Sequence, residues 1–269
     1  MKRTKPTEKL NNMLPKWVKS TVAVIFIIAI WYLAAVAVNN ALLLPDPLAV
    51  AKKLASLAQT GEFWQSIGAS FLRVLSGFAF GCAAGCVLAV GAYCIPILRS
   101  LLEPVMTLLK SVPVASFIML VILIFKRDVL PVFICFVMVI PILWSAVNLA
   151  LDTVPWQYKE LAQAYRLPLF KRVKSIYLPW TLPHLAQGML TALGFAWKSG
   201  IAAEVLCQPA KAIGTGIYEG KLYLETDHLF AWTVVVVILS LLLEKLLHYL
   251  LLRLKERKHN ENKEPNGQL

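Results

Sequence analysis

Long apolar runs without charged residues alternate with short charged segments along this chain. Ser20 to Pro45, Val74 to Leu98 and Val129 to Leu151 contain no Asp, Glu, Lys or Arg. Two further runs, 184–197 and 229–243, are apolar in the same way. In a helix, about 20 such residues cross the roughly 30 Å of hydrocarbon in a bilayer. The pattern therefore predicts five membrane-spanning helices.

A sixth span is predicted between the second and the third of these runs. Ser111 to Phe125 is uncharged, but so short a helix rises only about 22 Å. The span must also include Met106 to Leu109, with the Lys110 side chain extending toward the headgroups. Both chain ends are rich in Lys and Arg, which places both in the cytoplasm and requires an even number of spans. The expected fold is therefore an all-α integral membrane protein with about six transmembrane helices.

One membrane domain accounts for most of the chain. We predict a basic cytoplasmic tail over residues 1–19, a transmembrane domain over 20–252 and a polar cytoplasmic tail over 253–269. The first apolar run follows a basic start, as in a secretory signal peptide, but it is too long and lacks a clear cleavage site. We expect it to be the first span of a multi-pass protein of the cell membrane.

The composition supports an integral membrane protein and indicates which kind of partner its charge favours. Hydrophobic residues make up 58% of the chain and charged residues 16%, and the mean hydropathy of +0.66 excludes an ordinary water-soluble protein. The 27 Lys and Arg outnumber the 15 Asp and Glu, giving a net charge of +12. In so apolar a chain this excess points to anionic membrane lipids as partners, and not to nucleic acid.

The sequence carries no recognisable catalytic or metal-binding motif. Its five cysteines lie mostly within apolar runs, so we predict neither disulfides nor a zinc site. Its four histidines are far apart and form no H-E-x-x-H pattern, which disfavours a membrane-embedded enzyme. Gly214 to Leu222 resembles a phosphate-binding loop, but its spacing is one residue short and Leu222 replaces the required hydroxyl. We predict no cofactor in this chain, and we expect these glycines to shape an outward-facing turn.

Small residues form one face of the second predicted span. Gly77, Gly81 and Gly85 recur every four residues, and Ala89 continues the spacing. A helix face without side chains allows a second helix to approach closely, which is how helices associate in lipid. The partner is either another helix of the same chain, which we favour, or a second subunit.

Lys198 and Glu204 are charged residues in apolar surroundings on the fifth predicted span. Charges at membrane depth usually serve function or face a water-filled cavity, which makes both candidate pathway or gating residues. The alternative is that they lie near the outer end of the span. Their spacing places them about 9 Å apart along a helix and on different faces, so an ion pair between them would need a kink near Gly200. We interpret Arg73 as an interfacial anchor.

Residues 158–183, YKELAQAYRLPLFKRVKSIYLPWTLP, are too long and too patterned for a plain connector. A first short helix, Lys159 to Leu167, should end before Pro168, which disfavours a helical conformation of the preceding residue. A second helix should follow and close at Leu178-Pro179. The pair forms a stiff protrusion, or alternatively a hairpin that lies on anionic lipid. The residues expected to be presented to a docking partner are Glu160, Ala162 and Ala164.

This stretch resembles the EAA loop of type I ABC importer permeases. The family pattern is Glu-Ala-Ala, three residues, Gly, nine residues and Ile-x-Leu-Pro. Leu161 replaces the middle alanine, and Arg166 stands where the glycine is expected. The resemblance implies that the loop couples the permease to an ATPase, through Glu160, Ala162, Ala164, Arg166, Leu167, Ile176, Leu178 and Pro179.

The resemblance extends over residues 43–252 and is greatest to the permeases of the nitrate, sulfonate and taurine group. The stretches SVPVASFIMLVILIF, AWKSGIAAEVL and IGTGIY carry it. One departure is IFKRDVL, where Lys126 and Arg127 replace a turn that is commonly Trp-Phe-Gly-like in the group.

The resemblance implies a permease subunit of an ATP-driven importer. Its expected partners are a second copy of itself, two cytoplasmic ATPase subunits that use the ATP, and an extracytoplasmic solute-binding protein. The solute would be a nitrate-, sulfonate- or taurine-like anion, or a thiamine-precursor pyrimidine. The alternatives from other classes are a membrane-embedded enzyme and a channel without an ATPase partner.

Overall fold

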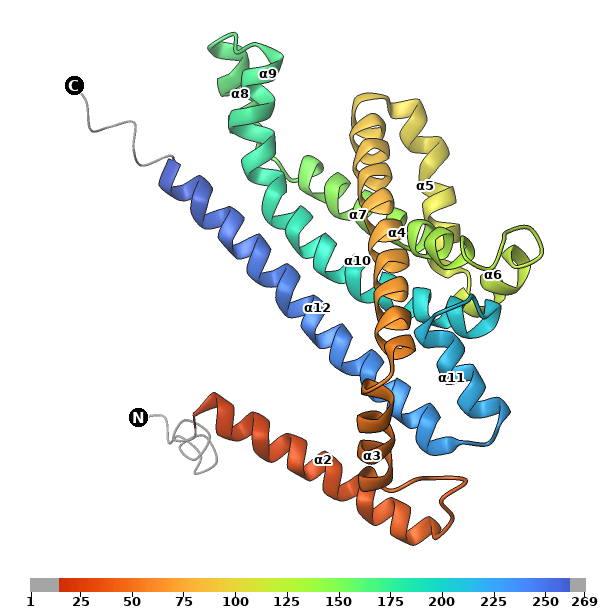
Figure 1. Cartoon of the computed structure of the whole chain (residues 1–269). Helices are drawn as coiled ribbons and strands as arrows, with labels where there is room; N and C mark the ends of the chain where they lie inside the picture. The colour runs from red at the N-terminus through yellow and green to blue at the C-terminus, as the bar shows by residue number, and fades with distance from the viewer. Residues whose placement is uncertain (1–14, 262–269) are drawn as a thin grey trace.

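The structure, a computed structural model, describes residues 15–261, and every regular element in that range is a helix (Figure 1). The predicted all-α fold is confirmed, whereas the predictions for residues 1–14 and 262–269 lie outside the described range. The elements are α2 (Lys16–Val38), α3 (Pro47–Ala58), α4 (Gly61–Cys94), α5 (Pro96–Ser111), α6 (Val114–Val121), α7 (Leu130–Asp152), α8 (Trp156–Ala164), α9 (Leu169–Arg172), the π-helix η1 (Val173–Tyr177), α10 (Leu178–Cys207), α11 (Ile213–Leu222) and α12 (Thr226–Glu261).

Five helical stretches are long and apolar enough to cross a membrane, which confirms the five predicted spans. They are Thr21–Val38, Gly61–Cys94, Leu130–Asp152, Leu169–Cys207 and Thr226–Arg253. Several of them extend beyond the predicted apolar run at one end or both, because a charged residue near a helix end ends the apolar run but not the helix. The helix α12, for example, continues to Glu261, so residues 253–261 of the predicted C-terminal tail are helical.

The second span shows the same effect most clearly. The helix α4 continues through Arg73 back to Gly61, where the Thr60 hydroxyl caps it by accepting a hydrogen bond from the Phe63 N–H. At its other end α4 stops at Cys94, two residues before Pro96, and not at Leu98 as predicted. Proline disfavours a helical conformation of the residue that precedes it, so Ile95 is extended and the chain turns there.

The sixth predicted span is a bent pair of helices, so residues 106–125 do not form the single helix that was predicted. The helices α5 and α6 meet at an angle of 102°. Val112 lies between them in an extended conformation, with φ −72° and ψ 126°, because Pro113 follows it. The pair is either a broken span or a re-entrant segment, which makes six candidate crossings at most in the described residues.

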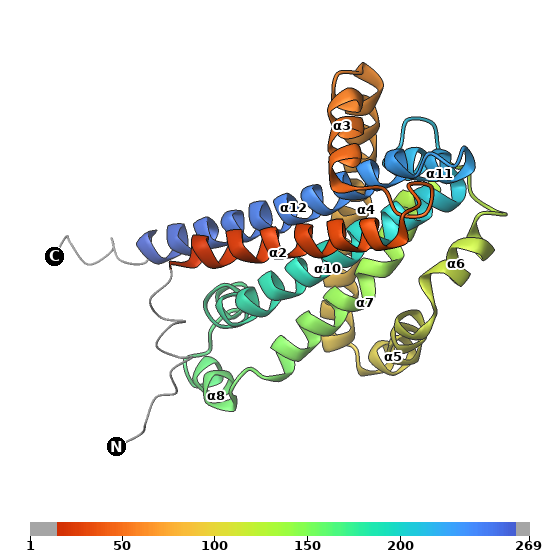
Figure 2. The same cartoon turned by 90° about the horizontal axis from the view of Figure 1, so that it is seen from below.

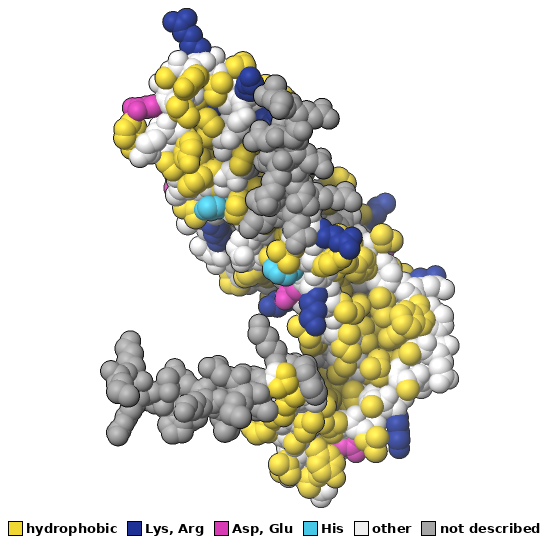
Figure 3. All heavy atoms as spheres, turned by 90° about the vertical axis from the view of Figure 1, so that its left-hand side faces the viewer, with side chains coloured by type: hydrophobic (Ala, Val, Ile, Leu, Met, Phe, Trp, Pro, Cys, Tyr) yellow, Lys and Arg dark blue, Asp and Glu magenta, His cyan; other side chains and the backbone are white. Residues whose placement is uncertain are grey.

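The core is built from α4, α7 and α10: α7 packs extensively against both α4 and α10, whereas α4 and α10 touch each other over a shorter stretch. The helix α7 lies between the other two (Figure 1) and is the most buried of the spans. The helices α2 and α12 lie on one side of this core, and α5 and α6 lie on the other in both views (Figures 1 and 2). Figure 3 shows broad hydrophobic patches on the side with α12, as expected where lipid covers a protein.

The two ends of the helix bundle carry different elements. The helices α8 and α9 lie at one end, which we call the loop end, and α3 and α11 lie at the opposite end (Figure 1). The prediction of a turn at 214–222 was wrong, because these residues form α11. Their glycines instead allow close packing, since a Cβ on Gly220 would lie 2.7 Å from the Leu229 backbone nitrogen on α12.

Candidate functional site

The loop between α7 and α10 begins with α8, which ends three residues before the predicted Leu167. Arg166 adopts the left-handed conformation, with φ 47°. Its N–H donates to the Gln163 carbonyl, and the Leu167 N–H donates to the Ala162 carbonyl, both at 2.9 Å. These two hydrogen bonds form a Schellman motif, in which glycine is the preferred residue at the left-handed position. The geometry thus explains why the pattern expects glycine where this chain has Arg166.

The surface of the loop is apolar as well as charged. Glu160 and Ala164 are exposed, but Ala162 is fully buried, so the prediction that Ala162 faces a docking partner was wrong. Tyr165, Leu169 and Phe170 instead project outward and are 74–78% exposed. Large apolar side chains gathered on a protruding loop mark an interaction surface. We call these three residues with Glu160 the loop patch.

The second half of the loop does not end at Leu178-Pro179 as predicted. It continues through α9 and η1 directly into α10, so Leu169–Cys207 is one helix of 39 residues. Pro179 has no N–H, and in a regular α-helix its ring would collide with the Ser175 carbonyl. The π-turn widens the helix at this point, and the Leu178 N–H donates to the Val173 carbonyl five residues earlier. Ile176 is half-buried in this segment, whereas Leu178 and Pro179 are exposed.

Glu204 lies near the opposite end of α10 and is fully buried. Its carboxylate accepts hydrogen bonds from the Ser70 hydroxyl at 2.7 Å, the Gly214 N–H at 3.2 Å and the Arg73 guanidinium at 3.3 Å. A Cβ on Gly214 would collide with Glu204, so only glycine lets the start of α11 approach this closely. The buried carboxylate therefore joins α4, α10 and α11.

Arg73 is the partner that the sequence analysis missed, and its interpretation as an interfacial anchor was wrong. It pairs with Glu204, and its second nitrogen lies 3.2 Å from the Asp128 carboxylate. It also donates to the carbonyls of Ala210 and Lys211. Arg73 and Glu204 are 131 residues apart, so no local sequence pattern links them. The only signal in the sequence was that each is a charged residue next to an apolar run.

Lys198 and Glu204 are not brought together. Lys198 is exposed on α10 and forms no ion pair with any residue in the described range. The role of either residue in a pathway or gate thus stays a prediction, but their environments differ sharply. Three hydrogen-bond donors hold the Glu204 carboxylate, whereas the Lys198 side chain lies at the surface of the protein.

The glycine face of α4 lies against α7 of the same chain. A Cβ on Gly81 would lie 2.7 Å from the Val139 Cβ and 2.9 Å from the Phe136 carbonyl oxygen. Gly77 and Gly85 are equally close to α7 atoms. The structure thus places all three glycines at a contact within the chain, where no side chain would fit.

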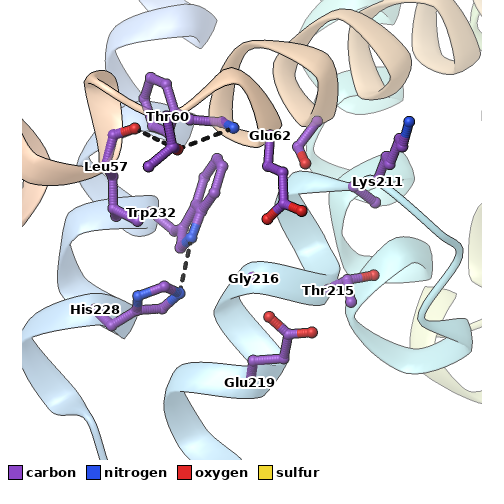
Figure 4. A pocket seen from close by; sticks show the side chains of 12 residues that line it. Leu57, Thr60, Glu62, Lys211, Thr215, Gly216, Glu219, His228 and Trp232 are labelled. Atoms are coloured by element: carbon purple, nitrogen blue, oxygen red, sulfur yellow. Dashed lines mark hydrogen bonds between the residues drawn. The ribbon is translucent and has the colours of Figure 1, made fainter.

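A cavity of about 240 Å³ opens at the opposite end, between the α3–α4 junction, α11 and α12 (Figure 4). Figure 4 shows Glu62 and Glu219 pointing into it from different helices. The Trp232 indole N–H donates to His228 Nε2 at 3.0 Å along one wall. Within residues 15–261 no three His, Cys, Asp or Glu side chains form a metal-binding group.

Comparison with known proteins adds a family to this geometry. The family model described as "Binding-protein-dependent transport system inner membrane component" matches residues 77–258. A "Probable ABC transporter permease protein" of Brucella melitensis is 29% identical over 81% of this chain and 87% of its own length. The "Putative aliphatic sulfonates transport permease protein SsuC" of Bacillus subtilis is 24% identical over 95% of this chain and 90% of its own length. Further relatives are named as permeases for taurine, nitrate and bicarbonate.

The fold also has a counterpart among solved structures. A chain of the MetNI methionine ABC transporter, in an inward-facing conformation, matches with a TM-score of 0.53 and 19% sequence identity. The match covers 71% of this chain and 91% of the other. The predicted permease fold is therefore confirmed, and so is the resemblance to the nitrate, sulfonate and taurine group.

Proposed function

This chain belongs to the family of binding-protein-dependent transport system inner membrane components, and we propose that it forms the membrane pathway of an ATP-driven importer for a small oxyanion. It is a multi-pass permease, a transport subunit and not an enzyme, as the names of its relatives indicate. The solutes named for those relatives are sulfonates, taurine, nitrate and bicarbonate, which share an anionic group with several oxygen atoms. This shared chemistry supports an oxyanion as the solute of this chain.

The loop patch is the observation that carries the proposal. Tyr165, Leu169 and Phe170 expose large apolar surfaces on the same loop as the exposed Glu160. An apolar patch with one acid fits a cleft that offers apolar contact and one basic side chain. We assign this surface to a pair of ATPase subunits that hydrolyse ATP, and we place the loop end in the cytoplasm together with both chain termini.

The continuous helix behind the loop suggests how docking drives transport. Movement of the ATPase subunits would push on α9, and the unbroken helix from Leu169 to Cys207 would carry the displacement along α10. Near its other end, α10 is joined to α4 and α11 through Glu204. Closure at the loop end would therefore displace the opposite end as well, and the ATPase state would bias the permease between two conformations.

The opposite end would then receive solute from an extracytoplasmic binding protein. The cavity with Glu62 and Glu219 lies on that side and offers a docking surface (Figure 4). A second copy of the chain would complete the pathway, which is expected for a permease whose pathway lies between two subunits.

A charge reversal at Glu160 tests the proposal. Glu160→Lys should abolish copurification of the ATPase subunits, because repulsion replaces attraction in a desolvated contact, whereas Glu160→Gln should be intermediate. Glu219→Lys, at the opposite end, is the matched control and should leave copurification unchanged. If the loop instead lies on anionic lipid, the added lysine would strengthen membrane attachment and leave ATPase recovery intact. Undiminished recovery of the ATPase with Glu160→Lys would remove this role from the loop.

A further inference from the structure

The helix α5 carries a polar face that the fold does not cover. Its inner face packs against α4 and α7 through Met106, which is 3% exposed, together with Leu102 and Leu109. Its outer face is exposed and polar at a spacing of three to four residues, which places these side chains in one line along the helix. We call this line the α5 stripe, and it consists of Ser100, Glu103, Thr107 and Ser111. A shallow groove follows it.

The stripe runs from the loop end toward the middle of the membrane. Near the start of α5, the Arg99 guanidinium forms two hydrogen bonds with the Asp152 carboxylate, at 2.9 and 2.7 Å. Asp152 is the last residue of α7 before the loop, so this ion pair marks the loop-end boundary of the membrane domain. Lys110 lies 11 residues further along, which is about 16 Å of helix and half of the roughly 30 Å of hydrocarbon.

Lys110 does not extend toward a headgroup region as the sequence suggested. Its ammonium donates a hydrogen bond to the Ser145 hydroxyl on α7, and that hydroxyl donates to the Pro141 carbonyl. No carboxylate in residues 15–261 forms an ion pair with Lys110. An ammonium group has three donors, so two are left for another acceptor.

Exposing a polar or charged side chain to lipid at this depth costs free energy, so such side chains usually face a bundle interior or a water-filled cavity. Among the described residues, no other helix of this chain covers the stripe (Figure 2). We propose that the α5 stripe lines the aqueous pathway of the solute and that Lys110 is the residue that selects an anion there. This inference rests on the proposed transport function and names where the charge selection takes place.

The chemistry of the stripe fits an oxyanion. The Thr107 and Ser111 hydroxyls donate to carbonyls one turn earlier, on Glu103 and Thr107, and a rotation about one bond redirects each toward a solute oxygen. The ammonium of Lys110 supplies the compensating charge beside them. Glu103 lies about 10 Å nearer the loop end, where it would repel an anion and favour its release.

Reaction with charged thiol reagents tests the inference without any transport assay. Thr107→Cys and Ser111→Cys are introduced with Cys94→Ala, and the full chain with its copurified ATPase subunits is placed in lipid nanodiscs open on both sides. The reagents are the anionic sulfonatoethyl and the cationic trimethylammonioethyl methanethiosulfonates, and each site is read by peptide mass spectrometry. Val105→Cys is the matched control, because Val105 is 47% exposed on α5 but lies outside the groove that follows the stripe. Buried Cys135 serves as an unreactive internal reference.

We expect both stripe sites to react at least tenfold faster than the Val105 site. Lys110→Gln should lower the ratio of anionic to cationic reaction rates at the Ser111 site about five- to tenfold, as expected for one charge about 7 Å away in water. Lys110→Arg should restore the ratio. If Lys110 only stabilises the end of α5, Lys110→Gln would lower the melting temperature and leave the ratio unchanged.

Two results would overturn the inference. Unreactive stripe sites in an intact complex would mean that α5 packs against a second copy or against lipid, and an unchanged ratio with Lys110→Gln would remove its role in selection. Absence of ATPase subunits from the wild-type preparation would contradict the proposed function instead, so the two failures are distinguishable.

Discussion

Replacing Glu204 by alanine should destabilise the membrane domain by about 3 kcal/mol. The carboxylate is fully buried and accepts hydrogen bonds from Ser70, Gly214 and Arg73. Breaking a buried ion pair by removing one partner costs about 3–5 kcal/mol, because the other charge stays buried. The lower end applies here, since the Arg73 side chain is 14% exposed and keeps Asp128 as a partner.

Two further variants separate the buried charge from the general effect of a substitution in α10. Glu204→Gln keeps the volume and one acceptor oxygen, but its amide N–H groups meet the donors of Gly214 and Arg73, so we expect about half of the alanine effect. Lys198→Ala removes an exposed charge from the same helix and should change the free energy of unfolding by at most about 0.5 kcal/mol.

Thermal melting of the purified protein in detergent measures these differences. At about 2–4 °C for each kcal/mol, Glu204→Ala should lower the melting temperature by about 6–12 °C and Lys198→Ala by less than about 2 °C. Arg73→Ala combined with Glu204→Ala should cost clearly less than the sum of the two single changes, because the residues interact directly. Equal shifts for Glu204→Ala and Lys198→Ala, or strict additivity in the double variant, would refute the reasoning.

Three other predictions concern packing, backbone conformation and a surface ion pair. Gly81→Ala should lower the melting temperature and complex yield strongly, whereas Gly68→Ala on the same helix, with no atom within 4 Å of its Cβ position, should not. Arg166→Gly should raise stability by about 1 kcal/mol in the same melting assay, since φ is 47° at Arg166. The hydrogen bond from Lys53 lowers the pKa of Glu225, so this contact stabilises the fold above the ordinary value of 4.5 and is lost as the pH falls through the lowered pKa. The protection factors of the α3 amides, which compare the exchange rates with the intrinsic rates at the same pH, should therefore fall at acid pH, and Lys53→Gln should remove that dependence.

Hydropathy was sufficient to find the five spans because charged residues border the apolar runs. It was insufficient to place helix ends, since Arg73 lies within α4 and forms an ion pair there. It also missed the bend at Val112, although Pro113 was a visible signal, because an apolar flank on both sides looks like one span. Hydropathy reflects which residues the bilayer accepts, whereas capping residues and prolines determine where each helix ends.

The candidate site was predictable in its sequence pattern but not in its geometry. The match to the EAA pattern identified the loop, yet it did not indicate that Ala162 faces inward or that the helix passes through Pro179 by a π-turn. The Arg73–Glu204 pair joins residues on different spans, and a single sequence gives no measure of such a distance. These features depend on which helices pack together, and they emerge only from the folded chain.

The packing also indicates which parts of the permease move together. The glycine face of α4 packs closely against α7, and α10 packs along the same helix. These three helices therefore cannot slide past one another without losing their packing contacts. The helices α5 and α6 are different, since a 102° bend joins them and only one face of α5 is covered. A push on the loop would therefore move the three core helices as one body, with Glu204 keeping the α11 end attached. The conformational change that opens a pathway would then take place mainly at the α5–α6 bend, close to Lys110 and the α5 stripe.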